Sequence, residues 1–441
     1  MIGHLRWCTP RCAPLLLLTL LTGFPRGAAG QAPVVTLDEA VRRARLILPS
    51  VVQARSQVQD ADAQIRSARG AYLPSLNANS SGSRSYAEGP SRVNDIGQIQ
   101  SGNVSSTNVG LGLSASVDLF TGFRRGADSR AARASSNAAE AGLTDAGYQA
   151  ELLATQQFFD ALAAQQLVRV REASVRRADE QLTLSVAKLH VGSATRSDSL
   201  RSLVNLGSAK LALVSAQSDV SSAQAALGRT LGVDGPVGAA DDSAFYNFSI
   251  GIDTAALQQE ALAHSPQVQS AEATAEAARA SVRATKAAYW PTLALTGALN
   301  WNGSNAADYQ LYNQRSVSLG LSWHIFDGFQ REQAIVNQVG NQDVAESNAL
   351  DTRRQIQASL TTQAALLEAA RVRIDITGTS VAAATEDLRV VNERYRVGAA
   401  TILDILTSQE ALAQAEVDAI TARFDYLKAK AQIEALIGRH L

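Results

Sequence analysis

Several runs of the chain alternate between apolar and polar residues. In the run 108–120 every second side chain is apolar, from Val109 to Leu119, and the residues between them are mostly small and polar. The run 316–326 repeats this pattern, and similar runs lie near 74–81 and 292–301. A period of two places successive side chains on opposite faces of a strand. We therefore predict four strands of about ten residues each, a length that crosses a bilayer when the strand is tilted.

Two much longer stretches have helical spacing instead. Residues 123–190 and 329–396 contain no proline and much alanine, and apolar residues recur every three or four positions. A helix of that length would extend about 100 Å, far more than a compact globule needs. Short breaks follow at 191–195 and 397–401, and return helices are expected to reach 232 and 438. The pattern predicts a rod of coiled helices with closely approaching alanine-rich faces.

The two sets of elements are copies of one design. The motif Tyr72-Leu73-Pro74 recurs 217 residues later as Tyr289-Trp290-Pro291, and the Val-Gly-x-x-Thr break at 191–195 recurs 206 residues later at 397–401. We predict a first repeat at 31–232, a linker at 233–252 around Pro236, and a second repeat at 253–441. The polar segments 80–107 and 302–315, which differ in length, are expected to be surface loops. The fold class is therefore mainly α, with two strand pairs per chain.

The alternating runs are open to two interpretations. A soluble antiparallel sheet would bury one face, whereas membrane strands would place one face in lipid and the other in water. The second interpretation is favoured because the face opposite the apolar one carries small polar residues rather than charges. Trp301, Tyr312 and Trp323 also lie near strand ends, where an aromatic girdle would place them, and His324 is expected to line water. Because four strands cannot close a barrel, the chain must oligomerise to insert.

The N-terminus has the layout of a secretory signal. Arg6 and Arg11 precede an apolar run at 15–21, and small residues follow at 28–30, so residues 1–30 are predicted to be a cleaved signal peptide. Cys8 and Cys12, the two cysteines of the chain, lie inside it. The mature chain would therefore lack disulfides and thiol chemistry. No other stretch resembles a membrane-spanning helix.

Composition and motifs narrow the function classes. The chain carries 40 basic and 41 acidic residues, which gives no electrostatic reason to expect nucleic acid. The histidines outside the signal are scattered, and no metal-ligand spacing, nucleophile elbow or phosphate-binding loop accompanies them. We predict no catalysis, no metal site and no cofactor. A periplasmic coiled-coil adaptor or structural protein is the alternative to a channel, but it would not need four bilayer-length strands.

With its signal, tandem repeat, strand pairs, long helices and Tyr-x-Pro motifs, the chain resembles the TolC family of outer-membrane efflux proteins along nearly its whole mature length. The most specific part is the stretch 395–406, Tyr-Arg-Val-Gly-Ala-Ala-Thr-Ile-Leu-Asp-Ile-Leu, which resembles the family's periplasmic turn. The resemblance implies a homotrimer with a 12-stranded barrel in outer-membrane lipid and a 12-helix tunnel in the periplasm. It also implies a passive duct of a tripartite efflux pump or type I secretion system. The sequence does not distinguish drug, metal, metabolite or polypeptide cargo.

The resemblance also assigns roles at the periplasmic tip. A periplasmic adaptor and an inner-membrane transporter would be the partners, with the adaptor facing the two turns; the implied tip residues are Val191, Gly192, Thr195, Val397, Gly398 and Thr401. The implied gate consists of Asp404 as a lumenal carboxylate and Tyr395 as a hydrogen-bonding tyrosine, with Asp198 and Ser197 as acceptors. Thr407 and Ala400 stand where family members hold a second carboxylate and a basic residue. Independently, Asp198 and Asp404 suit the first turn of a helix, where negative charge is favourable.

Overall fold

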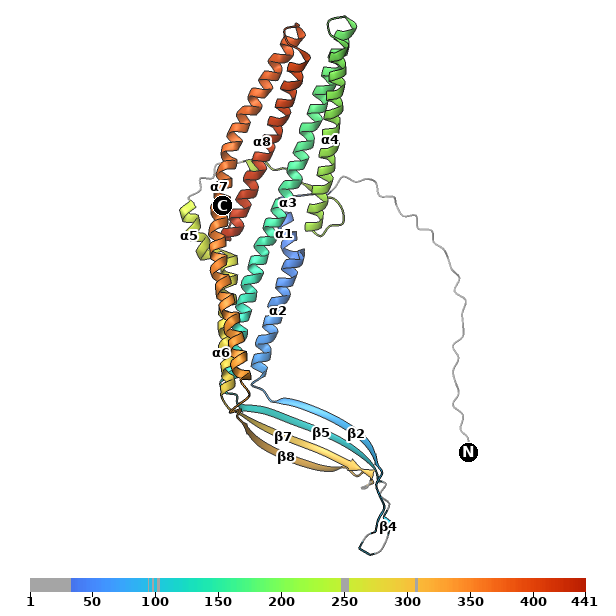
Figure 1. Cartoon of the computed structure of the whole chain (residues 1–441), viewed down its shortest axis with the longest axis vertical. Helices are drawn as coiled ribbons and strands as arrows, with labels where there is room; N and C mark the ends of the chain where they lie inside the picture. Colours follow the sequence, from blue (N-terminus) through green and yellow to red (C-terminus); the bar gives the residue numbers. More distant parts are fainter. Residues whose placement is uncertain (1–32, 94, 97–98, 101–103, 247–253, 306–307) are drawn as a thin grey trace, which may run out of the picture.

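Long paired helices form one end of the molecule and a curved four-stranded sheet forms the other (Figure 1). The computed structural model describes residues 33–93, 95–96, 99–100, 104–246, 254–305 and 308–441. The expected signal peptide, 1–30, and part of the expected linker, 247–252, lie outside these residues. Mainly helical structure with four antiparallel strands is the predicted fold class, and it is confirmed.

The helices follow the same order in both halves of the chain. The first half holds α1 (Leu37–Ile47), α2 (Pro49–Gly70), α3 (Arg124–His190) and α4 (Arg196–Thr230). The second holds α5 (Thr254–His264), α6 (Pro266–Lys286), η2 (Ala287–Tyr289), α7 (Gln330–Arg396) and α8 (Ile402–Ile437). Pro49 and Pro266 occupy the first position of their helices, where a missing N–H costs no helical hydrogen bond. The helices α3 and α4 form one hairpin and α7 and α8 form another, and the body of α3 packs against α2, α6 and α8.

The sheet contains β2 (Ser75–Ala87), β5 (Val104–Phe120), β7 (Thr292–Ser304) and β8 (Tyr312–Ser322) in that spatial order. Every neighbouring pair is antiparallel. The register places apolar residues opposite one another across the strands, as in Leu113 opposite Leu299 and Leu295 opposite Leu319. Small polar residues face one another on the other side, as in Ser116 opposite Thr296. One face of the sheet is therefore mostly apolar, with exceptions such as Arg315, which lies opposite Leu299.

The strands differ in extent from the expectation. The predicted loop 80–107 is partly strand, because β2 continues to Ala87 and β5 begins at Val104, and the predicted loop 302–315 shrinks in the same way. Backbone pairing continues where the apolar alternation has ended, as in Ser85 opposite Ser106. The short strands β3 (Arg92–Val93) and β4 (Ile99–Gln100) pair beyond the end of this hairpin.

The strand expected at 316–326 ends at Ser322, so the placement of Trp323, His324 and Ile325 on strand faces was wrong. The physical reason lies in the neighbouring strand. Ser322 pairs with Thr292, the first residue of β7, and Pro291 before it has no N–H to donate. The indole of Trp323 instead donates to the carbonyl of Tyr289, 3.2 Å away.

A cluster of aromatic side chains stabilises the middle of the molecule. The short strands β1 (Val34–Val35) and β6 (Gly238–Ala239) pair in parallel there, and η1 (Ser243–Tyr246) follows. The rings of Phe158, Phe159 and Phe245 meet edge to face at 5.4–6.0 Å between centroids. Phe158 is fully buried, and burying such a side chain contributes about 1.5–3 kcal/mol. This core fixes the helices from which both hairpins extend.

Candidate functional site

Each helical hairpin reverses at a glycine. Gly192 has φ 75° and Gly398 has φ 81°, a left-handed conformation that residues with a Cβ adopt at a cost. No atoms outside the turns lie within 4 Å of a Cβ built on either glycine. The backbone conformation, rather than crowding, therefore requires glycine at both turns.

The return helices begin with the same hydrogen-bonded cap. The Thr195 hydroxyl accepts from the Asp198 N–H, and the Asp198 carboxylate accepts from the Thr195 N–H at 2.9 Å. Thr401 and Asp404 repeat this arrangement at 2.8 Å. Such reciprocal caps satisfy two backbone donors that would otherwise lack a partner within the helix. Both threonines and both aspartates thus have a structural task at the tips.

The outermost side chains of the two turns are apolar and exposed. Val191 is 78% exposed and Val397 is 80% exposed. Gly192 and Gly398 follow directly and are exposed as well, as are Thr195 and Thr401. The six residues expected at the tips therefore lie on two accessible surfaces at the same end of the molecule (Figure 1).

Asp404 is held by its own helix. Its carboxylate accepts from the backbone N–H and the hydroxyl of Thr401, at 2.8 and 2.9 Å. The hydrogen bond from the Thr401 N–H lowers the pKa of Asp404, and the Thr401 hydroxyl and the charge of Arg394 lower it further. The carboxylate therefore stays ionised to a lower pH than an ordinary aspartate does.

Tyr395 is buried at the end of α7, with 6% of its surface exposed. Its ring packs within a small apolar cluster that includes Val391, Ile402 and Ile405. Within the described chain its hydroxyl makes no hydrogen bond. Burial raises the pKa of Tyr395, the charge of Asp198 raises it further, and Gln181 acts in the opposite direction. Gln181 is close enough to act on the hydroxyl, but its Nε2 atom also lacks a hydrogen-bond partner in the described chain.

The expected hydrogen bonds from Tyr395 to Asp198 and Ser197 are thus not formed within this chain. The Asp198 carboxylate is used by its own cap, and Ser197 is exposed in the first turn of α4. The structure instead brings Lys188 to Tyr395, with the Lys188 Nζ 3.9 Å from the ring centroid. Sequence reasoning missed Lys188 because nothing in the spacing of α3 shows which part of the other hairpin it meets.

A second duplicated arrangement joins the sheet to the helices. The Arg125 guanidinium lies over the ring of Tyr72, and the Arg331 guanidinium lies over the ring of Tyr289, with 5.3 and 5.0 Å to the centroids. Arg331 also pairs with Asp327 at 2.9 Å. The two arginines are 206 residues apart, so the repeat itself was a signal that could have identified them.

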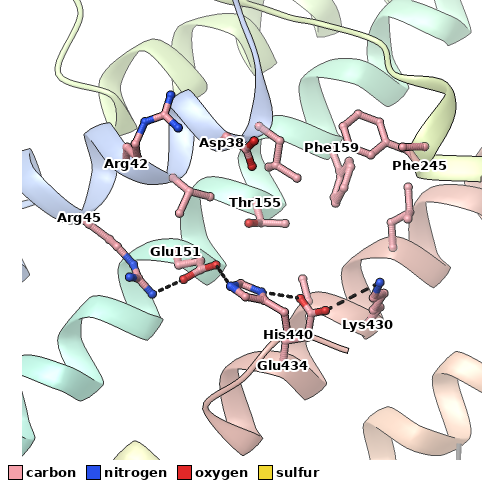
Figure 2. A pocket seen from close by; sticks show the side chains of 15 residues that line it. Asp38, Arg42, Arg45, Glu151, Thr155, Phe159, Phe245, Lys430, Glu434 and His440 are labelled. Carbon is pink, nitrogen blue, oxygen red and sulfur yellow. Dashed lines mark hydrogen bonds and ion pairs between the residues drawn. The ribbon is translucent and has the colours of Figure 1, made fainter. Parts of the chain in front are cut away.

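A cavity with charged walls lies at the middle of the molecule and measures about 500 Å³ (Figure 2). A chain of polar contacts crosses it: Arg45 pairs with Glu151, His440 lies 3.4 Å from Glu151 and 3.6 Å from Glu434, and Glu434 pairs with Lys430 at 3.8 Å. These pairs connect α1, α3, α8 and the residues after α8. The carboxylates of Glu151 and Glu434 already pair with cations of the same chain. We therefore interpret the cavity as part of the packing between helices.

Two features are absent from the residues that the structure describes. No three histidine, cysteine, aspartate or glutamate side chains gather there in a way that could hold a metal ion. None of the helices in these ranges has an apolar stretch long enough to cross a membrane.

Comparisons with known proteins point to one family. The model of the family described as outer membrane efflux protein matches residues 40–233 and 257–439. The chain is 27% identical over 434 residues to the outer membrane efflux protein BepC of Brucella suis biovar 1 (strain 1330), covering 96% of this chain and 90% of BepC. It is 24% identical over 446 residues to the outer membrane protein TolC of Escherichia coli (strain K12), covering 96% of this chain and 86% of TolC.

The fold has relatives among solved structures. The CmeC outer membrane channel of Campylobacter jejuni matches with a TM-score of 0.76 at 18% identity, covering 91% of this chain and 85% of that chain. VceC of Vibrio cholerae matches with a TM-score of 0.74 at 17% identity, covering 92% and 96%. These structures share the fold of the chain.

The family match covers both halves of the chain and agrees with the order of elements in each. It confirms the resemblance inferred from the sequence, the outer-membrane location, and a role in transport rather than catalysis. The chain belongs to the outer membrane efflux protein family, the TolC family, and is an efflux channel protein of the bacterial outer membrane.

Proposed function

We propose that three copies of the chain assemble into one passive, gated duct that crosses the outer membrane and the periplasm. The observation that carries this proposal is the open sheet. Within the described chain, β2 and β8 are the outer strands of the four-stranded sheet, and each has one edge without a partner strand. An unpaired backbone group costs several kcal/mol in hydrocarbon, so the edges need partners before the sheet can enter lipid.

The direction of the strands supports ring closure by identical copies. Because neighbours alternate in direction from β2 to β8, the two edge strands run in opposite directions. A β8 edge placed beside the β2 edge of another copy would continue the same antiparallel pattern. Three copies with four strands each would give a barrel of 12 strands. Its apolar face would contact outer-membrane lipid.

Exposed apolar stripes on the helices support the same assembly. On α4, Leu200, Val204, Leu211 and Val214 are all more than half exposed and recur at helical spacing. Val336, Val344 and Ile376 are similarly exposed at separate places along α7. A contiguous apolar stripe such as the one on α4 is typical of interfaces. We propose that neighbouring copies cover these residues and that the hairpins of three copies form a tunnel of 12 helices.

We further propose that residues 1–30 are a signal peptide and that 31–232 and 253–441 act as two repeat units joined by 233–252. The tips would face a periplasmic adaptor, which connects the duct to an inner-membrane transporter of an efflux pump or a type I secretion system. The exposed Val191 and Val397 support an apolar docking contact at the tips. The transporter, rather than this passive duct, would select the cargo.

The proposed gate places Asp404 near the tunnel axis, with Tyr395, Asp198 and Ser197 at the contact between hairpins. Three Asp404 carboxylates around one axis would attract cations. The hydrogen bonds from Thr401 lower the pKa of Asp404 and so oppose the rise that repulsion among three carboxylates would cause. The same carboxylate also accepts hydrogen bonds in the helix cap, so an experiment must distinguish the effect of its charge from the effect of the cap.

Single-channel recording in planar bilayers tests this proposal with two variants. Asp404→Asn removes the charge but keeps an oxygen that can accept in the cap, whereas Asp404→Ala removes both. We expect the wild type to form channels that divalent cations block, and both variants to lose most of that block. If Asp404→Asn is blocked like the wild type, the charge does not line the gate. If the wild type forms no channels, the duct itself is contradicted.

A further inference from the structure

The two hairpins of one chain touch through a lysine and a tyrosine close to their turns. Lys188 lies in the last turn of α3, and Tyr395 lies in the last turn of α7. The Lys188 Nζ lies over the Tyr395 ring, 3.9 Å from its centroid, and donates a hydrogen bond to the Tyr395 carbonyl. The pairs Arg177–Glu416 and Asn205–Gln409 also connect the hairpins, but they lie further from the turns.

Several electrostatic effects favour an ammonium group at this position. The face of an aromatic ring attracts a cation, and the attraction is stronger where water is partly excluded. Lys188 is half-buried and Tyr395 is buried. In addition, the carbonyls at the C-terminal ends of α3 and α7 carry partial negative charge, and the Lys188 side chain lies at both ends. The ammonium therefore compensates two helix ends at once.

The Tyr395 hydroxyl contributes no bond to this contact. It is buried without a hydrogen-bond partner in the described chain, and so are the Nε2 atom of Gln181 and the hydroxyl of Ser202 on the first hairpin. A buried hydroxyl without a partner destabilises rather than stabilises its surroundings. What Tyr395 offers to the other hairpin is the face of its ring and its backbone carbonyl.

The contact has no counterpart elsewhere in the repeat. The position 206 residues after Lys188 is Arg394, which donates to the carbonyl of Ala399 in its own turn at 3.2 Å. The position 206 residues before Tyr395 is Leu189, which has no aromatic ring. A reciprocal Arg394–Leu189 contact of the same kind is therefore chemically impossible.

We propose that Lys188 is the residue that latches the two hairpins of a subunit together at the tip, through the ring face and the carbonyl of Tyr395 and not through its hydroxyl. The latch rests on the proposed function, a gated duct whose tunnel is formed by these hairpins. It restores a basic contact in a chain that has Ala400 where family members have a basic residue. If the duct opens by separation of the two hairpins of a subunit, the contact between Lys188 and Tyr395 must break.

Four variants of the full-length trimer test the latch by single-channel recording. Lys188→Met keeps the length of the side chain without its charge, and we expect it to raise the ratio of open to closed time about tenfold. Tyr395→Leu should act in the same direction. Tyr395→Phe keeps the ring and should therefore shift the ratio much less than Lys188→Met does. Lys188→Arg should retain most of the wild-type ratio, since a guanidinium also binds an aromatic face.

Arg394→Met is the matched control, since it removes a cation from the equivalent position of the other hairpin, where the guanidinium binds the carbonyl of Ala399 in its own turn. Spin labels on cysteines placed at Val191 and Val397, diluted with unlabelled chains, give the distance between the two tips of one subunit. We expect a longer, broader distribution in Lys188→Met alone among the lysine and arginine variants. Opening by Tyr395→Phe equal to that of Lys188→Met, or an unchanged ratio and distance in Lys188→Met, would overturn the latch. If the wild type forms channels in the same recordings, the proposed duct stands whether or not the latch is overturned.

Discussion

At the residue scale, two glycines at equivalent positions of the repeat have different surroundings. Gly122 and Gly328 precede the long helices α3 and α7, with φ 62° and 70°. A Cβ at Gly122 would lie 2.3 Å from the Cβ of Trp290 and 2.9 Å from the carbonyl of Ala287, whereas a Cβ at Gly328 would meet nothing within 4 Å. Conformation requires glycine at both corners, but crowding adds a requirement only at the first.

From this difference we predict different losses of stability for alanine at the two positions. Gly328→Ala should cost about 1–2 kcal/mol, the strain of a left-handed residue with a Cβ. Gly122→Ala should cost clearly more, because atoms of Trp290 and Ala287 must also move. The loss of stability in each variant is measured as the decrease, relative to the wild type, in the temperature at which the trimer dissociates in detergent. Equal shifts for the two variants would show that the crowding at Gly122 is relieved without cost.

At the element scale, the alternating pattern predicted the existence of the four strands but not their ends. Alternation arises only where one strand face is apolar and the other is not. From Arg84 to Tyr86, the hairpin of β2 and β5 shows no apolar alternation, so its backbone pairing left no sign in the sequence. The opposite error occurred at Trp323 and Ile325. The alternation continues there in the sequence, but the partner strand β7 starts at Thr292 and so offers no residue opposite them.

The joints between sheet and helices give a second comparison between repeats. Arg331 and Asp327 form an ion pair at 2.9 Å, and their side chains are only 13% and 16% exposed. In the other repeat, Arg125 lies 3.7 Å from Asp118, whose side chain is 47% exposed. A carboxylate left unpaired is tolerated where water reaches it and is costly where it is buried.

We therefore expect Arg331→Met to lower the dissociation temperature of the trimer more than Arg125→Met does. The first change leaves Asp327 half-buried without its cation, a loss of about 3 kcal/mol, and the second costs about 1 kcal/mol. Both variants lose a guanidinium over a tyrosine ring, so that loss cancels in the comparison. A larger effect of Arg125→Met would mean that the ion pair at Asp327 is not what stabilises the joint.

At the scale of the whole molecule, contacts between distant elements were the part that the sequence could not supply. The two tip turns and their caps follow from local chemistry, since glycine permits the reversal and threonine with aspartate three residues later forms the cap. The partner of Tyr395 depends instead on how two hairpins, 206 residues apart in sequence, lie beside each other. Lys188 is identified as that partner only once the hairpins are placed in space.

The central claim is that identical copies complete the sheet, and disulfide trapping across its two edges tests it most directly. Within one chain β2 and β8 are separated by two strands, so their backbones lie about 14 Å apart, beyond the reach of a disulfide. Both cysteines of the sequence, Cys8 and Cys12, lie before the described residues, and serine can replace them. A cysteine at Ser318 on β8 is then paired with cysteines at successive positions of β2 from Leu76 to Ser81. The account predicts that positions on one face of β2 form disulfides in membranes, giving covalent dimers and trimers and nothing larger. Chains that remain monomeric at every position of the scan would contradict it.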